Sequence, residues 1–186
     1  MNNLFGDNFA ARRKDNIAGL GAFGVSDPSG SSGYREVRSG AGPVVFTIGY
    51  ERRDSEDLIS KLLDAGVEVL VDIRERPFSR KPDFRRGPLE KACADAGIEY
   101  ESWTELGSTG HQRDALKDTG DFSAFRKQFR ELVKRGRKDD IEELAELSQE
   151  KQIALICYER CHDECHRSIV AEFVAELNDA VITAIL

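Results

Sequence analysis

Short apolar runs alternate with segments of helical periodicity from residue 43 onward. The apolar runs cover residues 44–48, 68–73, 98–101 and 152–157, and the last of them is the last strand that the pattern predicts. Apolar side chains at three- and four-residue spacing, which is typical of amphipathic helices, cover 54–66, 88–96, 122–133, 141–148 and 164–177. Strands that alternate with helices predict an α/β fold, layered α/β/α, with a mainly parallel sheet of about four or five strands.

The first 43 residues have a different composition. They contain half of the glycines in the chain and a Ser/Gly/Pro run from Ser26 to Gly33, and they show no sustained apolar period. Such a segment buries too little apolar surface to offset the entropy of ordering it. We therefore expect a disordered, flexible Gly/Ser-rich extension over 1–43, followed by a single α/β domain over 44–186. A protein partner that binds this extension is an open alternative.

The carboxyl ends of parallel strands meet at one edge of a sheet, where α/β proteins bind their ligands. The segments at the ends of the predicted strands are Gly49-Tyr50, Asp72 to Arg74, Trp103 to Glu105, and Cys157 to Glu159. We expect these four segments to converge in one crevice.

Residues 153–168 hold the densest group of reactive side chains. Three of the four cysteines and two of the three histidines lie there, together with carboxylates and two arginines, where the last predicted strand turns into the last predicted helix. Such a turn presents side chains and free backbone N–H groups at the sheet edge. The functional site is therefore expected at this turn.

Composition and charge exclude some classes of protein. The chain has 186 residues, and its net charge of −7 argues against a protein that coats DNA. The sequence shows no apolar run as long as a membrane span and no signal-peptide core at its N-terminus. The bunched cysteines do not form the spaced framework of a secreted disulfide protein. We therefore expect a cytoplasmic protein without a membrane partner.

Several separated motifs carry a resemblance to a known family. In chain order they are Thr47-Ile-Gly49-Tyr50, Leu70-Val-Asp72-Ile-Arg74 with Pro77 and Ser79, Phe84, Gly97-Ile-x-Tyr100, Leu106-Gly107, and Cys157-x-Glu159 with Cys165-His166-Arg167. Over roughly residues 44–175 the chain resembles the family known as domain of unknown function 488. The resemblance implies a compact α/β domain of an uncharacterised bacterial or archaeal protein, and it assigns no activity.

The chain lacks one residue of the family pattern and contains two reactive residues that the pattern does not require. The family usually has a second glycine after Leu-Gly, whereas here Leu106-Gly107 is followed by Ser108-Thr109-Gly110. The loop that ends in the Cys-His-Arg motif does not require Cys161 or His162 in the family. A mechanism that depends on either residue would therefore be particular to this protein.

One interpretation of the cysteine–histidine cluster is a metal site. The candidate ligands are Cys157, Cys161, Cys165 and His166. Cys161 and Cys165 are four residues apart, as are His162 and His166, so each pair would share a face if this stretch were helical. Such soft ligands suit tetrahedral zinc, although the spacing is not the paired C-x₂-C of a zinc ribbon. The cofactor therefore stays open, with zinc as the candidate.

A second interpretation is a thiol-transfer loop. Cys161-x₅-Arg167-Ser168 has the form of the cysteine phosphatase loop, and the order of the motifs is similar to that of rhodanese sulfurtransferases. A cysteine at a helix N-terminus beside an arginine has a lowered pKa, and the same N–H groups bind an oxyanion. Such loops are normally rich in glycine, however, and this one contains none.

A third interpretation is acid–base chemistry on an anionic ligand. The catalytic candidates are Glu159, Cys157, His166 and Asp72, and the anion-binding candidates are Arg74, Arg167, Gly49 and Tyr50. Glu159 would act as acid or base, His166 would carry a proton, and the arginines would hold the anion. The chain would then be an enzyme, or a domain of enzyme-like build, for a phosphate-bearing or other anionic ligand such as a nucleotide.

The loop 74–86 is strongly basic and contains two phenylalanines. Its cationic side chains beyond Arg74 are Arg76, Arg80, Lys81, Arg85 and Arg86. Arginine interleaved with aromatic side chains is a usable surface for nucleotides or single-stranded nucleic acid, which makes a nucleic-acid accessory protein an alternative function. A solvated loop with both Phe78 and Phe84 in the core explains the same pattern.

The residues of the cysteine–histidine cluster can also be explained by a purely structural role, without metal binding or catalysis. Cys157 and Cys165 would then be small apolar core residues, and Arg167 would pair with Asp72 as a structural clamp. Cys93 is read as a core residue, and His111 lies in a Ser/Thr/Gly loop that suggests no role.

Overall fold

The computed structural model describes residues 42–185, so the extension predicted over 1–43 lies outside the described residues except for its last two positions. The described chain forms one five-stranded sheet in which all neighbouring strands are parallel. The strands are β1 (Val44–Gly49), β2 (Val69–Asp72), β3 (Glu99–Ser102), β4 (Ile153–Cys157) and β5 (Val181–Ile185). Their order across the sheet is β3-β2-β4-β1-β5.

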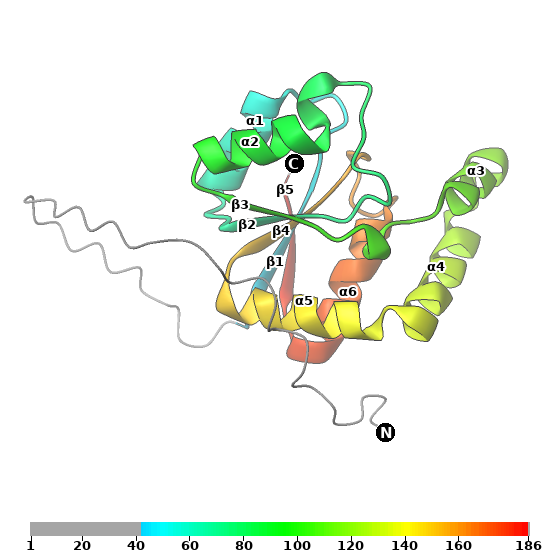
Figure 1. Cartoon of the computed structure of the whole chain (residues 1–186). Helices are drawn as coiled ribbons and strands as arrows, with labels where there is room; N and C mark the ends of the chain where they lie inside the picture. Colours follow the sequence, from blue (N-terminus) through cyan, green and yellow to red (C-terminus); the bar gives the residue numbers. More distant parts are fainter. Residues whose placement is uncertain (1–41, 186) are drawn as a thin grey trace, which may run out of the picture. The chain divides into compact units, whose positions relative to one another are not determined.

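Helices cover both faces of the sheet, which confirms the α/β/α layering (Figure 1). Helices α1 (Ser55–Asp64) and α2 (Arg86–Asp95) cover one face. Helices α4 (Phe122–Gly136), α5 (Lys138–Glu150) and α6 (His166–Asn178) cover the other, and α3 (Gly110–Thr119) packs against α4. Two short 3₁₀ helices, η1 (Pro82–Phe84) and η2 (Thr104–Leu106), lie in the connections. Between residues 42 and 185, no helix combines the length and the apolar character that crossing a bilayer requires.

The inner strands β2 and β4 are buried throughout, as expected for a parallel sheet with both faces covered. Alternate residues of each strand enter opposite cores. Val69, Val71 and Ile73 pack with α4, α5 and α6, whereas Leu70 packs with α1 and α2. The face on which a polar side chain lies is therefore set by its position in the strand.

The strand order places the topological switch point between β1 and β4. These strands are neighbours, with Gly49 beside Cys157 in the register. The chain leaves β1 toward α1 on one face and leaves β4 toward α6 on the other. Ligands of open α/β sheets bind beyond the carboxyl ends of the strands at such a point.

Two elements differ from the sequence-based prediction. The prediction that 152–157 is the last strand is wrong, because β5 pairs with β1 at the edge of the sheet. The segment around His111, expected to be a loop, is helix α3. None of the α3 side chains is buried, so the helix leaves no apolar period in the sequence. Thr109 caps α3 and forms a capping box with Gln112, so the residues that replace the second family glycine begin this helix.

Candidate functional site

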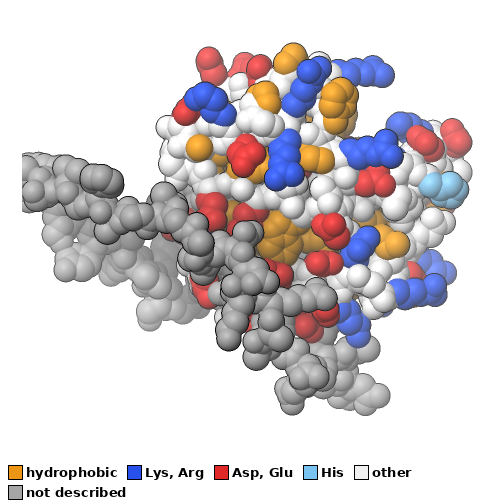
Figure 2. Space-filling view, in the orientation of Figure 1, with side chains coloured by type: hydrophobic (Ala, Val, Ile, Leu, Met, Phe, Trp, Pro, Cys, Tyr) orange, Lys and Arg blue, Asp and Glu red, His pale blue; other side chains and the backbone are white. Residues whose placement is uncertain are grey.

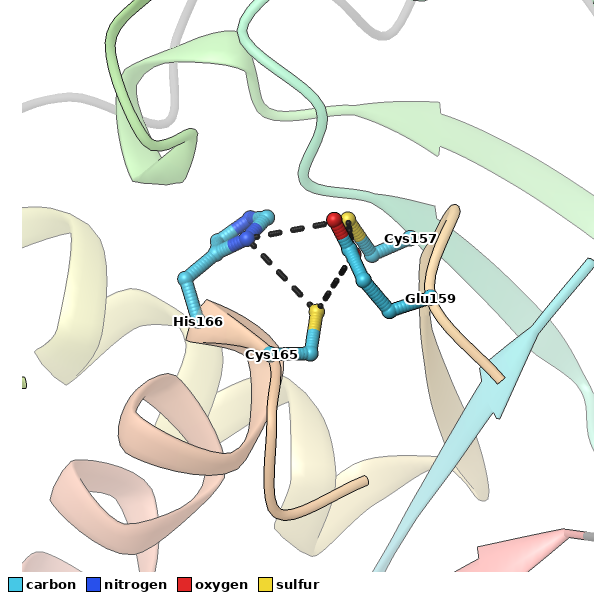
Figure 3. Close-up of side chains that lie close together, drawn as sticks. All are labelled: Cys157, Glu159, Cys165 and His166. Atoms are coloured by element: carbon cyan, nitrogen blue, oxygen red, sulfur yellow. Dashed lines mark hydrogen bonds between the residues drawn. The ribbon is translucent and has the colours of Figure 1, made fainter. Parts of the chain in front are cut away.

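Four side chains converge where β4 leads into α6 (Figure 3). Cys157 is the last residue of β4, and Glu159 follows it by two positions. Cys165 is the N-cap of α6, and His166 is the first residue of that helix. Their sulfur, oxygen and nitrogen atoms all lie within 4.8 Å of one another. We call these four residues the thiol–histidine cluster.

The histidine nitrogen and the carboxylate oxygen of the cluster each lie at nearly equal distances from the two sulfurs. The Nδ1 atom of His166 lies 3.6 Å from Cys157 Sγ and 3.7 Å from Cys165 Sγ. Glu159 Oε2 accepts hydrogen bonds from the same two thiols, at 3.1 and 3.0 Å. Both sulfurs therefore face the same nitrogen and the same carboxylate oxygen, as ligand atoms do around a common centre.

The ring of His166 is held in one orientation. Its Nε2 atom lies 3.0 Å from the carbonyl oxygen of Ile73, which can only accept a hydrogen bond, so Nε2 carries the hydrogen. The ring also packs edge-on against Phe129, with 5.5 Å between the centroids. In the neutral ring the lone pair of Nδ1 therefore points at the two sulfurs.

Burial and mutual contact shift the pKa values of the cluster in opposite directions. Burial raises the pKa of Glu159. The hydrogen bond between the two thiols raises the pKa of Cys157, and burial adds to this. Although burial opposes it, the hydrogen bond from Cys157 and the charge of His166 lower the pKa of Cys165. For His166, burial works against the imidazolium, but the Cys165 thiolate raises its pKa. The cluster therefore favours negative charge on Cys165.

Arg167 holds the loop that carries Glu159. Its guanidinium is buried and donates to the carbonyl oxygens of Glu159, at 2.5 Å, and Arg160, at 3.0 Å. The expected pairing of Arg167 with Asp72 is wrong, because Asp72 pairs with Arg74 instead. Arg167 Nε is buried and has no hydrogen-bond partner among residues 42–185.

The same loop crosses the end of β1 at Gly49. Backbone hydrogen bonds join Tyr50 N to Cys157 O at 3.2 Å and Glu51 N to Tyr158 O at 2.9 Å. A Cβ atom at Gly49 would lie 1.9 Å from the carbonyl oxygen of Glu159. Gly49 therefore contributes to the site by having no side chain, which lets the loop close over the sheet.

Replacing Gly49 with alanine should lower the free energy of unfolding by about 1–3 kcal/mol or more. The added methyl group would overlap the backbone of Glu159, which cannot move without displacing that residue. Gly87→Ala is the matched control, since a Cβ there meets no atom within 4 Å and Gly87 lies in α2. Urea denaturation of both variants measures the difference. Equal stability of the two would show that the loop does not need this close approach.

Asp72 and Arg74 lie on the opposite face of the sheet from the thiol–histidine cluster. Asp72 is beside Ile156 in the register, and both side chains face α1 and α2. Asp72 accepts hydrogen bonds from Arg74, at 2.8 and 2.5 Å, and from Tyr100, at 2.6 Å. Arg74 also donates to the hydroxyl of Tyr50 and to the carbonyl of Phe84. The expected single crevice is thus divided by the sheet into two polar clusters.

Cys161 and His162 lie outside the cluster. The spacing in the sequence would place Cys161 and Cys165 on one face, and likewise His162 and His166, only if this stretch were helical. Helix α6 begins at His166, so residues 161–165 are not part of a helix and neither pair shares a helix face. Cys161 is exposed, and His162 Nδ1 lies 2.8 Å from the hydroxyl of Thr47. Burial lowers the pKa of His162, and the charge of Arg167 lowers it further.

Trp103 is not brought to the cluster either. It packs against the core under α4 to α6, and its indole donates to Glu101 at 2.6 Å. Glu159, in contrast, joins the two cysteines and His166 as a fourth ligand-type side chain, although the sequence suggested it only as an acid or base. The signal for this was the two-residue spacing of Cys157 and Glu159, which keeps both side chains on one face of an extended chain.

A thiol reagent such as Ellman's reagent should modify one cysteine rapidly in the native protein at pH 8, and that cysteine is Cys161. The other three are buried, and burial raises the pKa of Cys93 to about 12, so its thiol stays protonated. Cys161→Ser should remove the fast phase, and Cys93→Ser should leave it unchanged. A fast phase that survives Cys161→Ser would place a second thiol at the surface.

Comparison with known proteins gives one match. Neither the curated proteins nor the solved structures contain a match to the chain. The model of a family described as "Domain of unknown function DUF488" matches residues 54–174, which is well over half of the 186 residues. The matched segment contains the whole thiol–histidine cluster as well as Asp72 and Arg74. The chain, an uncharacterised α/β protein, therefore belongs to the DUF488 family.

Proposed function

We propose that this protein is a zinc-binding domain of enzyme-like build, in which Cys157, Cys165 and His166 bind the metal ion and Glu159 occupies the fourth position. An anionic ligand would bind by taking the place of Glu159. The observation that carries the proposal is the position of His166 Nδ1, which is nearly equidistant from two buried thiols.

The sulfur–nitrogen distances fit a zinc centre. A tetrahedral zinc ion with bonds of about 2.3 Å to sulfur and about 2.0 Å to nitrogen holds these ligand atoms about 3.5 Å apart. The corresponding distances here are 3.6 and 3.7 Å. Two thiolates balance the charge of Zn²⁺, which offsets the cost of burying a cation at this position. This fit supports zinc over a hard cation such as Mg²⁺, which takes oxygen ligands.

The contact of His166 with the backbone also supports a metal ligand. Histidines that bind metal ions through one ring nitrogen donate the other N–H to a carboxylate or a carbonyl, and this orients the ring. Here Ile73 O receives that hydrogen bond. The ring is thus oriented for metal binding through Nδ1 by a residue at the end of a neighbouring strand.

Glu159 differs from the other three residues in two ways. Its oxygen lies at hydrogen-bond distance from the thiols, shorter than the separation of about 3.5 Å in a tetrahedral zinc site. It is also partly exposed, whereas both cysteines and His166 are buried. These features favour Glu159 as the exchangeable ligand, and the displaced carboxylate would remain close enough to act as acid or base.

The ligand would approach along Glu159 and bind through an anionic oxygen, such as that of a phosphate group. The guanidinium of Arg167, whose terminal nitrogens hold the backbone of the Glu159 loop, adds a positive charge beside this loop. Bound zinc would supply Lewis-acid polarisation of that oxygen or of a water molecule. The residues of the chain would hold the ligand and accept or donate the proton.

A thiol-transfer function is the second candidate, favoured by the placement of Cys165 at the N-terminus of α6 and by its lowered pKa. Cys165 is only 2% exposed, however, so a substrate would need the loop to open. Metal content separates the two candidates.

The test is zinc content per chain, measured by plasma mass spectrometry on untagged protein purified under reducing conditions. We expect about one zinc ion per chain, lost in Cys165→Ser and retained in the matched control Cys161→Ser, because Cys161 lies outside the cluster. Glu159→Gln should keep the metal, since three ligands remain. A wild-type protein that stays metal-free after incubation with zinc would overturn the proposal. A rapidly alkylated Cys165 in that protein would support thiol transfer.

A further inference from the structure

The loop between β2 and α2 presents an aromatic side chain to solvent. Phe78 is 66% exposed, whereas Phe84, six residues later, is 1% exposed and stacks on Tyr50 with 4.5 Å between centroids. The two phenylalanines of the basic loop therefore have opposite environments. A solvated loop with both rings in the core does not describe this arrangement.

The exposure of Phe78 is imposed by a well-connected loop. Its backbone N–H donates to Arg76 O at 2.7 Å, and Arg86 N donates to Pro77 O at 3.0 Å. Lys81 joins the loop to the segment after β1, because its Nζ donates to the carbonyls of Tyr50, at 3.3 Å, and Arg53, at 2.6 Å. The ring is thus held outward by the loop around it.

One cationic side chain lies against the exposed ring, and others are exposed in the same loop. The guanidinium of Arg85 lies 5.1 Å from the centre of the Phe78 ring and donates through Nε to Ser79 O. Arg76, Arg80 and Arg86 are also exposed, and within 76–86 one carboxylate, Asp83, opposes five cationic residues. Glu90 of α2 lies 3.9 Å from Arg86. Figure 2 shows Lys and Arg side chains beside exposed hydrophobic ones over the α1–α2 layer.

A second exposed aromatic continues from this loop toward the end of β4. Tyr158 packs edge-on against Tyr50, with 5.4 Å between centroids, and Tyr50 in turn stacks on Phe84 of the loop. Tyr158 is 49% exposed. The row Phe84–Tyr50–Tyr158 therefore connects the basic loop with a further ring that can be reached from solvent.

We propose that the loop 76–86 binds single-stranded nucleic acid, with a base stacked on Phe78 and the backbone phosphates contacted by Arg76, Arg80, Arg85 and Arg86. Exposed rings interleaved with arginines are the combination that single-strand binding uses, because every unpaired base has a face to stack and every nucleotide a phosphate. A duplex hides its base faces and would be bound less well. The local excess of positive charge in a chain of net charge −7 gives the surface its preference for a polyanion.

The loop 76–86 is separate from the proposed zinc site. The loop lies with α1 and α2 through Phe84, whereas the thiol–histidine cluster lies on the other face of the sheet. Each proposal can therefore fail while the other holds.

The test is fluorescence anisotropy of a labelled 15-nucleotide oligothymidylate titrated with the full chain at several salt concentrations. We expect the binding constant to fall with salt, and Arg80→Gln with Arg85→Gln to reduce the log–log slope by about 1.4, since each phosphate contact contributes about 0.7. Phe78→Ala should weaken binding on the order of tenfold or more. Phe78→Trp should bind like the wild type, and its added fluorescence should be quenched by the oligonucleotide.

Two matched controls test whether exposed hydrophobic or cationic side chains outside the loop 76–86 contribute to binding. Leu63→Ala removes another exposed hydrophobic side chain, in α1, and Arg135→Gln removes another exposed arginine, in α4. Neither should change the affinity more than twofold. Three results would overturn the proposal: no binding at low salt, equal binding by Phe78→Ala and the wild type, or equal affinity for a duplex of the same length.

Discussion

Replacing Asp72 with asparagine should lower the free energy of unfolding by about 3–5 kcal/mol, the range for breaking a buried ion pair from one side. Asparagine keeps the shape of the side chain but leaves the guanidinium of Arg74 buried without its counter-charge. Asp72 is fully buried, and it accepts from Arg74 and from the hydroxyl of Tyr100. Arg74 extends this network to Tyr50 and Phe84, so the loss should also loosen the basic loop.

The matched control is Asp95→Asn, which removes the ion pair with Lys91 on the surface of α2. That pair has an N–O distance of 2.6 Å, but its side chains are 75% and 65% exposed, so its removal should cost at most about 0.5 kcal/mol. Chemical denaturation of both variants gives the comparison. A loss below about 1 kcal/mol for Asp72→Asn would show that the buried pair is not needed to hold the loop.

Removal of zinc should destabilise the protein by about 4 kcal/mol when the reference contains zinc at a thousand times its dissociation constant. In the proposed site the ion would bind residues from β4 and from the start of α6, and it would thereby join two elements that otherwise meet through a loop. Without the ion, Glu159 accepts hydrogen bonds from the two thiols, and its partial burial raises the pKa of Glu159 because its charge is costly there. Urea denaturation with excess zinc and with a chelator measures the effect.

Cys165→Ser and Cys161→Ser separate metal binding from other actions of the chelator. Stability of the Cys165→Ser variant should not depend on zinc, whereas Cys161→Ser should respond like the wild type. If wild-type stability is the same with zinc and with chelator, the cluster does not hold a metal that matters to the fold.

The sequence predicted those elements that bury an apolar face. The strands at 69–72 and 153–157 and the amphipathic helices around them follow directly from the spacing of apolar residues. Helix α3 was missed because it buries no side chain. Strand β5 was missed although its residues, VITAI, are mostly apolar and β-branched, and in the structure they lie mostly exposed at the edge of the sheet. The buried inner strands and the amphipathic helices were thus the elements that the hydrophobic pattern predicted most directly.

The location of the site was predictable, but its division into two clusters was not. That Cys157, Cys165 and His166 lie near the end of β4 follows from their place in the sequence. Asp72 lies on the other face because the register pairs it with Ile156 and not with Cys157. A shift of one residue would reverse this, and the sequence alone does not specify the register.

The loop after β4 required the structure as well. His166 faces the thiols, and not solvent, because α6 begins at that residue, and a start four residues earlier would have favoured Cys161 as a ligand. The loop passes close over Gly49, and Arg167 donates hydrogen bonds to the carbonyl oxygens of this loop. Both contacts depend on backbone positions that the sequence does not give.

The most direct test of the zinc proposal is X-ray absorption spectroscopy at the zinc edge of the purified wild-type protein. From the zinc proposal we expect two sulfur ligands at about 2.3 Å and two nitrogen or oxygen ligands at about 2.0 Å, from Cys157, Cys165, His166 and Glu159. A first shell with no sulfur, or with a third sulfur from Cys161, would contradict this arrangement.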